Sequence, residues 1–324
     1  MKTNLKVLAL LFPEETIQKL LLDSEDVDIC YVYNAYKQNL FSRCIRRLKF
    51  LLPFDSLVFS DDYITRDISG YDVIILDETI FPDRIIKNIR KRNNHCKLIY
   101  WMWNTVEHTT QMKLYDRWKK WNQLLAMRAK YKFQISSFDE GDCKKYGLVY
   151  NNQVAPYFKD ISIPDDLSNS IFFYGLDKGR LTFIKHLYDT FTNKGYQCNF
   201  NVVPDAHKKY DEFAFEKIHE EYFRPYKDII EQEVSSKALL EILQKGQKGI
   251  TWRALESLFY KKKLITNFKE IKQYDFYNPN NIFVLGMDDM NQFDLFMRTK
   301  FENISDKEVI KYTFKGWLSN MLKE

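Results

Sequence analysis

Short apolar runs alternate with helix-like segments along the first half of the chain. Segments with helical spacing include Phe41–Leu52, Arg84–Arg92 and Met112–Lys130. The apolar, β-branched or aromatic runs are Lys6–Phe12, Ile29–Tyr33, Val73–Leu76, Lys97–Trp103 and Phe133–Ser136. Strands that alternate with helices in this order predict a parallel sheet with helices on both of its faces.

The alternation stops at Asp160–Asn169, where turn-forming residues predict a linker, and then resumes. The last segment, Lys307–Lys323, has the amphipathic spacing of a helix. The apolar runs of the second series are Ile171–Gly175, Gln197–Val203, Lys263–Thr266 and Asn281–Leu285. We therefore predict two doubly wound, Rossmann-like α/β domains that face each other across a cleft. Their predicted limits are 1–160 for the N-terminal domain, 161–169 for the linker, and 170–324 for the C-terminal domain with its terminal helix.

Composition narrows the class of protein. A chain of 324 residues suits two α/β domains, and its net charge of +5 is too small for a dedicated nucleic-acid binder. The five cysteines are scattered and never spaced as C-x-x-C, which fits a reducing cytosol. The first apolar run ends at Pro13 without a cleavage site, and no stretch approaches the ~20 apolar residues of a membrane span. We expect a cytoplasmic protein, either free or resting on the inner face of the cell membrane.

The first cluster of candidate site residues lies where the run Ile171–Gly175 ends and a helix is expected to begin. Gly175 permits a tight turn, and the unpaired N–H groups of the next helix would point toward a ligand. Lys178 and Arg180 place two cations where a diphosphate could bind. The same residues also fit an ordinary strand–helix turn with solvated charges.

A second cluster lies in the stretch Gly246–Leu285. The loop Gln247–Thr251 precedes a short helix on which Arg253 and Glu256 stand one turn apart, and a buried strand follows. The carboxylate can accept hydrogen bonds from ribose hydroxyls, and the arginine can bind a phosphate. The alternative is a surface ion pair worth well under ~1 kcal/mol. Two such loops at strand ends of one domain favour a nucleotide site.

Four short motifs carry a resemblance to a known family. They are F-Y-G-L-D-K-G-R at Phe173–Arg180, S-S-K-A-L-L-E-I-L at Ser235–Leu243, G-Q-K-G-I-T-W-R-A-L-E-S-L at Gly246–Leu258 and K-K-L-I-T-N at Lys262–Asn267. Together they resemble the donor domain of bacterial GT-B glycosyltransferases of capsule and lipopolysaccharide assembly. The segment Ile135–Asp142, with the K-Y-G that follows it, is similar to the end of the N-terminal domain of these enzymes. The likeness covers most of residues 131–290 and is weak before them.

The resemblance implies a nucleotide sugar as the donor substrate, a glycan or lipid-linked saccharide as the acceptor, and no cofactor. The residues implied to contact the donor diphosphate are Gly175, Lys178 and Arg180. Arg253 and Glu256 would hold phosphate and ribose, and Thr251 would close the pocket. Some retaining members of the family carry two widely spaced glutamates. Here Leu264, not an acid, stands eight residues after Glu256, which argues against the retaining class.

A transfer that inverts the configuration of the sugar needs a base for the acceptor hydroxyl proton. The candidates are Glu107 and His108, which follow the strand predicted at Lys97–Trp103. Asp77 and Glu78, at the end of the run Val73–Leu76, are the second choice. Glu107 also fits the role of an acid in the first turn of a helix, where the helix dipole favours it.

Two further segments leave alternatives open. At helical spacing, Phe41–Leu52 has an apolar face opposite three arginines and a lysine, so it can rest on anionic lipid or pack on its own sheet. The pair Asp26 and Asp28 raises the alternative of a metal-dependent, single-domain transferase. The pair precedes an apolar run rather than following one, so we expect a loop that leads into the strand. Lys178 and Arg180 would neutralise the leaving nucleotide instead, and we expect no metal site.

These observations predict a metal-independent glycosyltransferase whose C-terminal domain holds the donor. Its N-terminal domain would bind the acceptor and supply the base. Two alternatives stay open. One is a non-catalytic nucleotide-binding or glycan-binding homologue, or a subunit that supports another transferase. The other is a nucleotide-sugar epimerase of the same fold.

Overall fold

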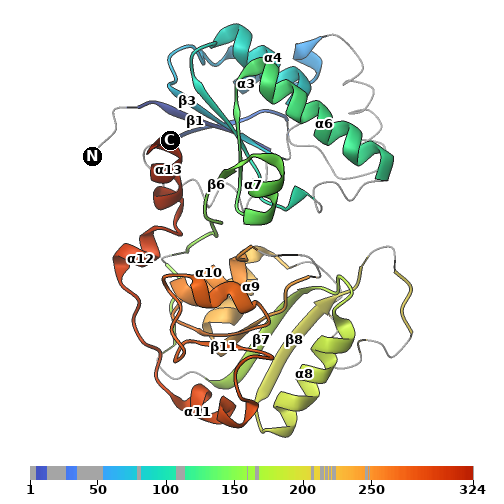
Figure 1. The fold of residues 1–324 in the computed structure, drawn as a ribbon, viewed down its shortest axis with the longest axis vertical. Coiled ribbons are helices and arrows are strands. Elements are labelled where there is room, and N and C mark those ends of the chain that lie inside the picture. The colour runs from blue at the N-terminus through green and yellow to red at the C-terminus, as the bar shows by residue number, and fades with distance from the viewer. Residues whose placement is uncertain are drawn as a thin grey trace. The chain divides into compact units, whose positions relative to one another are not determined.

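The chain folds into two α/β units, each built on one parallel sheet (Figure 1). The units comprise Met1–Pro156 with Leu318–Glu324, and Tyr157–Trp317. A computed structural model describes residues 5–12, 27–34, 54–78, 82–106, 114–158, 160–164, 168–205, 208–211, 224–244 and 249–323, with residues 215, 218, 220 and 247. The predicted helix Phe41–Leu52 lies outside the described residues.

The N-terminal unit contains a six-stranded parallel sheet in the order β2-β1-β3-β4-β5-β6. Its strands are β1 (Val7–Leu11), β2 (Val27–Tyr31), β3 (Val73–Asp77), β4 (Lys97–Trp101), β5 (Gln134–Ser137) and β6 (Val149–Tyr150). Its helices are η1 (Asp55–Leu57), α3 (Asp61–Thr65), α4 (Pro82–Arg92), α6 (Leu114–Tyr131) and α7 (Glu140–Tyr146). Every residue of β1 and β3 is buried, as expected for central strands of a parallel sheet covered on both faces.

The C-terminal unit contains a five-stranded parallel sheet in the order β11-β10-β9-β7-β8. Its strands are β7 (Ser168–Leu176), β8 (Gln197–Val203), β9 (Ser236–Glu241), β10 (Lys263–Thr266) and β11 (Ile282–Val284). Its helices are α8 (Leu181–Asn193), α9 (Tyr226–Val234), α10 (Trp252–Phe259), η2 (Lys269–Gln273), η3 (Met290–Gln292), α11 (Phe293–Arg298) and α12 (Asp306–Ile310). Helix α13 (Phe314–Lys323) ends the chain. Helices α8 and α11 share one core cluster with alternate residues of β7 and β9. Helix α9 packs against β7 and β9, and α10 packs against β9 and β10.

Each sheet contains a point where the strand order reverses. In the N-terminal unit, β1 pairs with β2 on one side and β3 on the other. In the C-terminal unit, β7 likewise pairs with β8 on one side and β9 on the other. Ligands of doubly wound folds bind at the carboxyl ends of the strands that flank such a reversal. The carboxyl ends of β1 and β3, and of β7 and β9, are therefore the places to look for chemistry.

The predicted alternation of strands and helices is confirmed, and the structure corrects several of the predicted limits. The units divide after Pro156, before the predicted linker, because the ring of Tyr157 packs against that of Phe259 in the C-terminal unit (ring centroids 5.1 Å apart). Leu318–Glu324 belong to the N-terminal unit, whereas the sequence pattern predicts the whole terminal helix in the C-terminal domain. Asp28 lies inside β2, not in a loop before it, because the pairing of β2 with β1 starts at Val27.

The terminal segment forms two helices, α12 and α13, where the amphipathic spacing predicts one. A capping box starts α12: the Ser305 hydroxyl accepts from the Glu308 N–H, and the Glu308 carboxylate accepts from the Ser305 N–H. Between the helices, the Tyr312 hydroxyl donates to Asp275 Oδ1 at 2.7 Å. Lys311 binds the other oxygen of the same carboxylate. This anchor holds the chain in a turn that a continuous helix could not make.

Gly316 makes that turn sterically feasible, and replacing it with alanine tests the point. A Cβ at this position would overlap the Ile310 carbonyl oxygen and lie 2.8 Å from Lys311 Cα, both of them backbone atoms. Alanine favours a helix by about 1 kcal/mol over glycine, but overpacking of this kind costs about 1–3 kcal/mol. We therefore expect Gly316→Ala to lower the Tm in a thermal unfolding measurement. Gly70→Ala is the control, because no atom lies within 4 Å of its added Cβ; equal midpoints for the two variants would contradict the steric argument.

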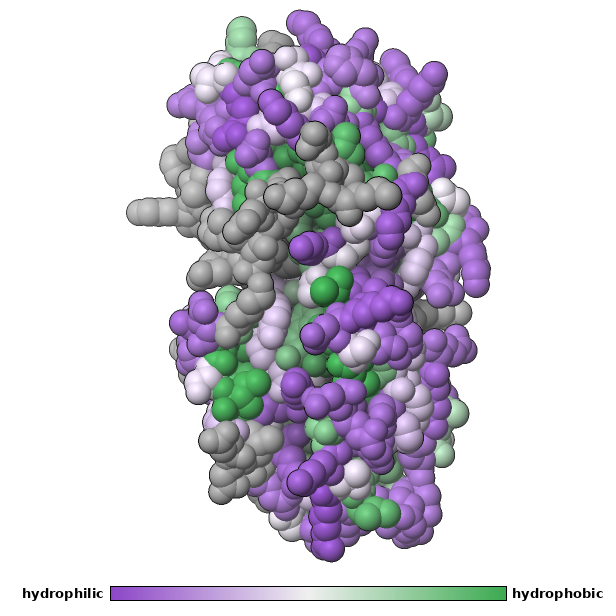
Figure 2. All heavy atoms as spheres, turned by 90° about the vertical axis from the view of Figure 1, so that its left-hand side faces the viewer, coloured by the Kyte–Doolittle hydropathy of each residue, from purple (hydrophilic) through white to green (hydrophobic). Residues whose placement is uncertain are grey.

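The exposed large apolar side chains of the described residues come from separate segments of the chain. On the face drawn in Figure 2, hydrophilic residues dominate and the hydrophobic ones form small groups among them. The exposed large apolar residues in the described part include Phe54, Phe183, Met287, Leu295 and Ile310. Among the helices of the described residues, none combines the length and the apolar composition that crossing a membrane requires.

Candidate functional site

The turn between β7 and α8 brings the first cluster of predicted residues to the switch point of the C-terminal sheet. Lys178 and Gly179 have positive φ angles of 46° and 78°. The Arg180 N–H closes the turn by donating to the Asp177 carbonyl at 2.9 Å, and Arg180 is the N-cap of α8. A lysine with positive φ is uncommon, so the turn is held by its surroundings rather than by local preference.

Arg180 joins the two strands that flank the switch point. Its guanidinium donates to the carbonyl oxygens of Leu176, at the end of β7, and Ile242, which follows β9. Its Nε also donates to the Asp177 carbonyl at 3.1 Å. Burial lowers the pKa of this guanidinium. Among the described residues it forms no ion pair: it donates to carbonyl oxygens, and the carboxylates of Asp177, Asp205 and Glu241 act on its charge only from a distance.

Lys178 adds a second cation beside Arg180. Its backbone N–H donates to Asp205 Oδ1 at 3.1 Å, while its ammonium has no hydrogen bond or ion pair within the described part of the chain. Partial burial, with the nearby charge of Arg180, lowers the pKa of the Lys178 ammonium. Two partly buried cations at one strand end, neither paired with a carboxylate, favour an anionic ligand.

The carboxylate of Asp177 fixes the loop that carries these cations. The sequence pattern alone does not indicate this role. Its buried carboxylate accepts from the Leu181 N–H at 2.7 Å, Lys208 Nζ at 2.6 Å and the Tyr210 hydroxyl at 2.8 Å. Burial raises the pKa of Asp177, but the hydrogen bonds from Lys208 and Tyr210 outweigh it and leave the pKa lowered. Asp177 therefore stays ionised and ties the loop after β7 to the loop after β8.

A buried carboxylate lies at the end of the central strand β9. Glu241 is 3% exposed and accepts hydrogen bonds from the hydroxyls of Thr251 and Thr266. Burial raises its pKa. Thr251 is the N-cap of α10, yet its side chain makes no cap bond, because its hydroxyl is directed to Glu241. Glu241 therefore fixes the start of α10 against the ends of β9 and β10.

Arg253 and Glu256 form an ion pair, but it is buried rather than on the surface. The Arg253 Nη1 lies 3.1 Å from Glu256 Oε2, and Arg253 also pairs with Glu233 of α9. The Glu233 side chain is fully buried and that of Glu256 is 2% exposed, while Arg253 retains 15%. The Tyr226 hydroxyl donates to the other oxygen of Glu256. One arginine thus balances two buried carboxylates between α9, α10 and the sheet.

Of the predicted base candidates, Glu107 and His108 lie outside the described residues. The second-choice pair is described. Asp77 ends β3 and is fully buried, and Glu78 follows it and is partly buried. Glu78 Oε1 accepts from Asn104 Nδ2 at 2.5 Å. This places a carboxyl group at the switch point of the N-terminal sheet.

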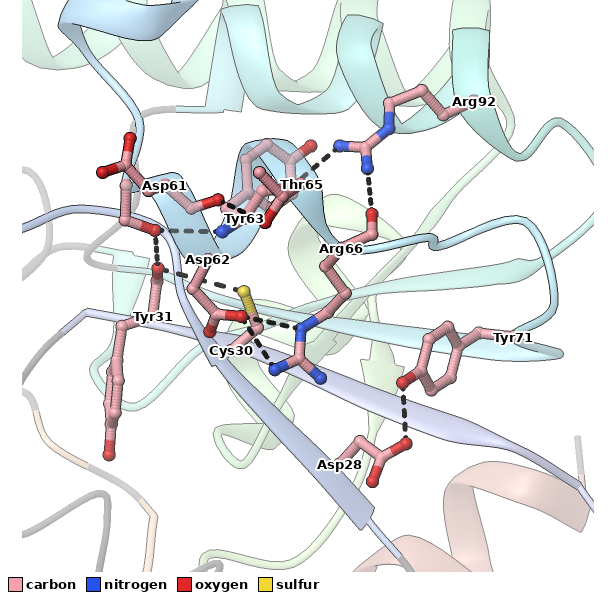
Figure 3. A network of polar contacts seen from close by, with 11 residues as sticks. Asp28, Cys30, Tyr31, Asp61, Asp62, Tyr63, Thr65, Arg66, Tyr71 and Arg92 are labelled. Carbon is pink, nitrogen blue, oxygen red and sulfur yellow. Dashed lines mark hydrogen bonds and ion pairs between the residues drawn. The ribbon is translucent and has the colours of Figure 1, made fainter.

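The acidic residue considered for a metal site is engaged elsewhere. Figure 3 shows Asp28 on β2 beside Tyr71, whose hydroxyl donates to Asp28 Oδ2 at 2.7 Å. In the same view, Asp62 accepts from the Arg66 guanidinium at 2.9 Å, close to the thiol of Cys30. Asp26 lies outside the described residues. Within the described ranges, no group of three His, Cys, Asp or Glu side chains is arranged to hold a metal ion.

The structure thus places Lys178 and Arg180 in one turn, with Gly175 inside β7 just before it rather than in the turn, and places Thr251 beside the end of β9. Sequence reasoning missed five residues that hold the site together, which are Asp177, Lys208, Glu233, Glu241 and Tyr226. Asp177 and Glu241 had a signal, since each is an acid at the end of an apolar run. Glu233 and Tyr226 had none, because α9 was not predicted.

Comparisons with known proteins agree with this arrangement at the level of the fold. No protein-family model and no curated protein sequence matches the chain. A glycosyltransferase from Rickettsia africae ESF-5 is similar with a TM-score of 0.50 and 12% identity, covering 99% of this chain and 98% of that one. The lipopolysaccharide outer core galactosyltransferase WaaB gives a TM-score of 0.49 at 12% identity, over 98% of each chain. A UDP-GlcNAc 2-epimerase from Methanocaldococcus jannaschii gives 0.45 at 9% identity, also over 98% of each chain.

The fold is therefore that of GT-B glycosyltransferases, as predicted. The similarity to the Rickettsia structure covers nearly the whole of both chains, so it includes both α/β units. At 12% identity it shows a shared fold and leaves the reaction to be argued from the site.

Proposed function

We propose that this protein is a glycosyltransferase that moves a sugar from a nucleotide-sugar donor to a glycan or lipid-linked acceptor in bacterial surface polysaccharide assembly. The observation that carries the proposal is the pair of cations, Lys178 and Arg180, at the switch point of the C-terminal sheet. Neither is paired with a carboxylate among the described residues. The shared fold and the motif resemblance support the reaction class. The resemblance alone supports the capsule or lipopolysaccharide setting.

In this proposal the C-terminal unit holds the donor. Lys178 and Arg180 would bind the diphosphate and stabilise the charge that develops on it as it leaves, so that no metal is needed. Arg253 keeps some exposure and is the member of its cluster that a phosphate can reach. Glu256 would reach the ribose hydroxyls only if Tyr226 or Arg253 released one of its oxygens. Thr251, at the start of α10, would border the same pocket.

An epimerase and a non-catalytic binding homologue would have the same fold, so the test must distinguish them from a transferase. An epimerase would convert a nucleotide sugar without any acceptor, and a binding homologue would hold it unchanged. The experiment is a titration of the full-length protein with UDP, GDP and dTDP, followed by product analysis with the matching sugars. Binding together with release of nucleoside diphosphate supports a transferase. A changed sugar still attached to its nucleotide supports the epimerase, binding without turnover supports the binding homologue, and no binding refutes all three.

Replacing Lys178 with alanine is expected to weaken nucleoside diphosphate binding about 10-fold or more, because a charge-assisted hydrogen bond is worth about 1.5–3 kcal/mol. Unfolding stability should stay the same, since the ammonium has no partner within the described part of the chain. Isothermal titration calorimetry and thermal unfolding measure the two effects. Lys300→Ala, an exposed lysine of the same unit, is the control. Equal affinities for the two variants would remove Lys178 from the donor site.

A further inference from the structure

Glu78 is fixed at the switch point of the N-terminal sheet by several hydrogen bonds. Its backbone N–H donates to the Trp101 carbonyl at 3.1 Å, and its carbonyl accepts from the Tyr100 hydroxyl at 2.9 Å. Its carboxylate accepts from the Asn104 side chain at 2.5 Å and from the Asn104 backbone N–H at 3.4 Å. Both backbone groups and the carboxylate are thus held from β4 and the loop after it. A carboxyl group held in this way is preorganised.

The charges around Glu78 do not stabilise its ionised form. No ion pair joins it to a cation among the described residues, and the fully buried Asp77 stands next to it. Within the described part of the chain, Tyr100 of β4 is the other titratable group in contact with it, and the charges of Glu78 and Asp77 help to raise the pKa of that tyrosine. Burial and, to a smaller extent, the charge of Asp77 raise the pKa of Glu78, hydrogen bonds from Asn104 and from the Trp103 backbone oppose them, and the resulting pKa is about 7. A purely structural carboxyl group would gain from a cation, so this arrangement is typical of a functional site.

Only one of the two adjacent acids can meet a substrate. Asp77 is fully buried, whereas Glu78 is partly exposed. Glu78 also lies where parallel strands end, which is where ligands of this fold class bind. A base with a pKa near neutrality is deprotonated at physiological pH and still accepts a proton effectively.

We propose that Glu78 is the general base of the transfer, taking the proton of the acceptor hydroxyl as that oxygen attacks the anomeric carbon of the donor. The proposal rests on the proposed function. In this step a bond forms between the acceptor oxygen and the anomeric carbon. The bond from that carbon to the phosphate oxygen breaks, and its electron pair leaves with the nucleoside diphosphate. The proton ends on Glu78, and direct displacement inverts the configuration at the anomeric carbon.

Asn104 is a positioning residue in this proposal. It orients the carboxylate, and its hydrogen bonds lower the pKa of Glu78 against the effect of burial. Removing its side chain in Asn104→Ala should therefore raise the pKa of Glu78. The acidic limb of the rate profile should move to higher pH, because a larger fraction of the base is then protonated at a given pH. A merely structural role would not move that limb.

The test uses the full chain, with UDP-, GDP- and dTDP-sugars as donors and water as the acceptor. The native rate of nucleoside diphosphate release should fall tenfold per pH unit below about 7. Glu78→Gln should lose at least about 100-fold of this rate, because a general base contributes 10²- to 10⁴-fold. It should also lose the acidic limb and keep its affinity for the nucleoside diphosphate. Glu140→Gln, an exposed acid on α7 of the same unit, should behave like the native protein.

A direct titration gives a readout that does not depend on turnover. In protein labelled with ¹³C at the glutamate carboxyl carbons, the signal that disappears in Glu78→Gln should titrate near pH 7 rather than near 4.5. A midpoint near 4.5, or an unchanged rate and limb in Glu78→Gln, would overturn the assignment and leave the proposed function standing. Absence of both nucleotide binding and hydrolysis in the native protein would overturn the proposed function, and the assignment with it.

Discussion

Arg253→Met should destabilise the C-terminal unit by about 3–5 kcal/mol, because removing one partner of a buried ion pair leaves an uncompensated charge. Two carboxylates are affected here: Glu233 is fully buried and Glu256 is 2% exposed. Methionine retains most of the aliphatic volume, so the loss of charge is the main change. Urea unfolding at pH 7, followed by circular dichroism, measures the effect.

A compensated variant separates the charge from the packing. Adding Glu233→Gln and Glu256→Gln to Arg253→Met removes all three charges and should recover most of the lost stability. Arg298→Met, at an exposed position of α11, should change stability by no more than about 0.5 kcal/mol. If Arg253→Met kept the native midpoint and lost only nucleotide affinity, Arg253 would be a ligand residue without a structural role.

The ion-pair cluster around Arg253 also shows what the sequence pattern can predict and what it cannot. The i,i+3 spacing of Arg253 and Glu256 correctly indicated that the two side chains are neighbours on one helix. Such a pair contributes well under ~1 kcal/mol to the free energy of unfolding when it is exposed, and its loss costs several kcal/mol when it is buried. The burial of this pair depends on Glu233 and Tyr226. Both residues lie on α9, whose position against the sheet is set by long-range packing. No local spacing could have placed them.

Strand β9 is a second feature that depends on long-range packing and not on local sequence. Its sequence, Ser-Lys-Ala-Leu-Leu-Glu, contains good helix formers and no β-branched residue, so local propensity does not identify a strand. Its place between β7 and β10 makes it a strand, since the alternative would leave two sheet edges unpaired. By contrast, β1 and β3 were predicted correctly because continuous apolar runs are typical of buried parallel strands. The first turn of the candidate donor site was predictable for a similar reason, since Gly175, Lys178 and Arg180 are contiguous with an apolar strand.

Because local propensity does not identify β9 as a strand, the switch point between β7 and β9 could not be predicted from the sequence. Without β9, Arg180 is only a cation near a glycine. With β9 in place, its guanidinium bridges Leu176 and Ile242, and its position at the reversal of strand order becomes visible. The function of a local motif in this fold therefore depends on which strands become neighbours.

Glu78→Gln should make the N-terminal unit more stable at pH 8, by up to about 3 kcal/mol, while it slows transfer at least about 100-fold. The sign follows from linkage: the folded pKa of Glu78 is about 7, above the ordinary value of 4.5. The native protein then binds more protons than the unfolded chain between these values. Its full stability is therefore present below pH 4.5 and is lost as the pH rises through about 7. Glutamine cannot ionise, so the variant does not incur that loss.

Hydrogen exchange of the β3 amides at pH 5 and pH 8 provides the measurement, because β3 ends next to Glu78 and lies in the centre of the sheet. After correction for the intrinsic exchange rate, the native protein should lose protection between the two pH values and Glu78→Gln should not. Equal pH dependence in the two proteins would mean that folding does not raise the pKa of Glu78, and lower stability of the variant at both pH values would mean that the carboxylate stabilises the fold. An ionisable group that weakens the structure at neutral pH is retained for its chemistry. Greater stability combined with lost transfer would therefore distinguish a base from a structural acid.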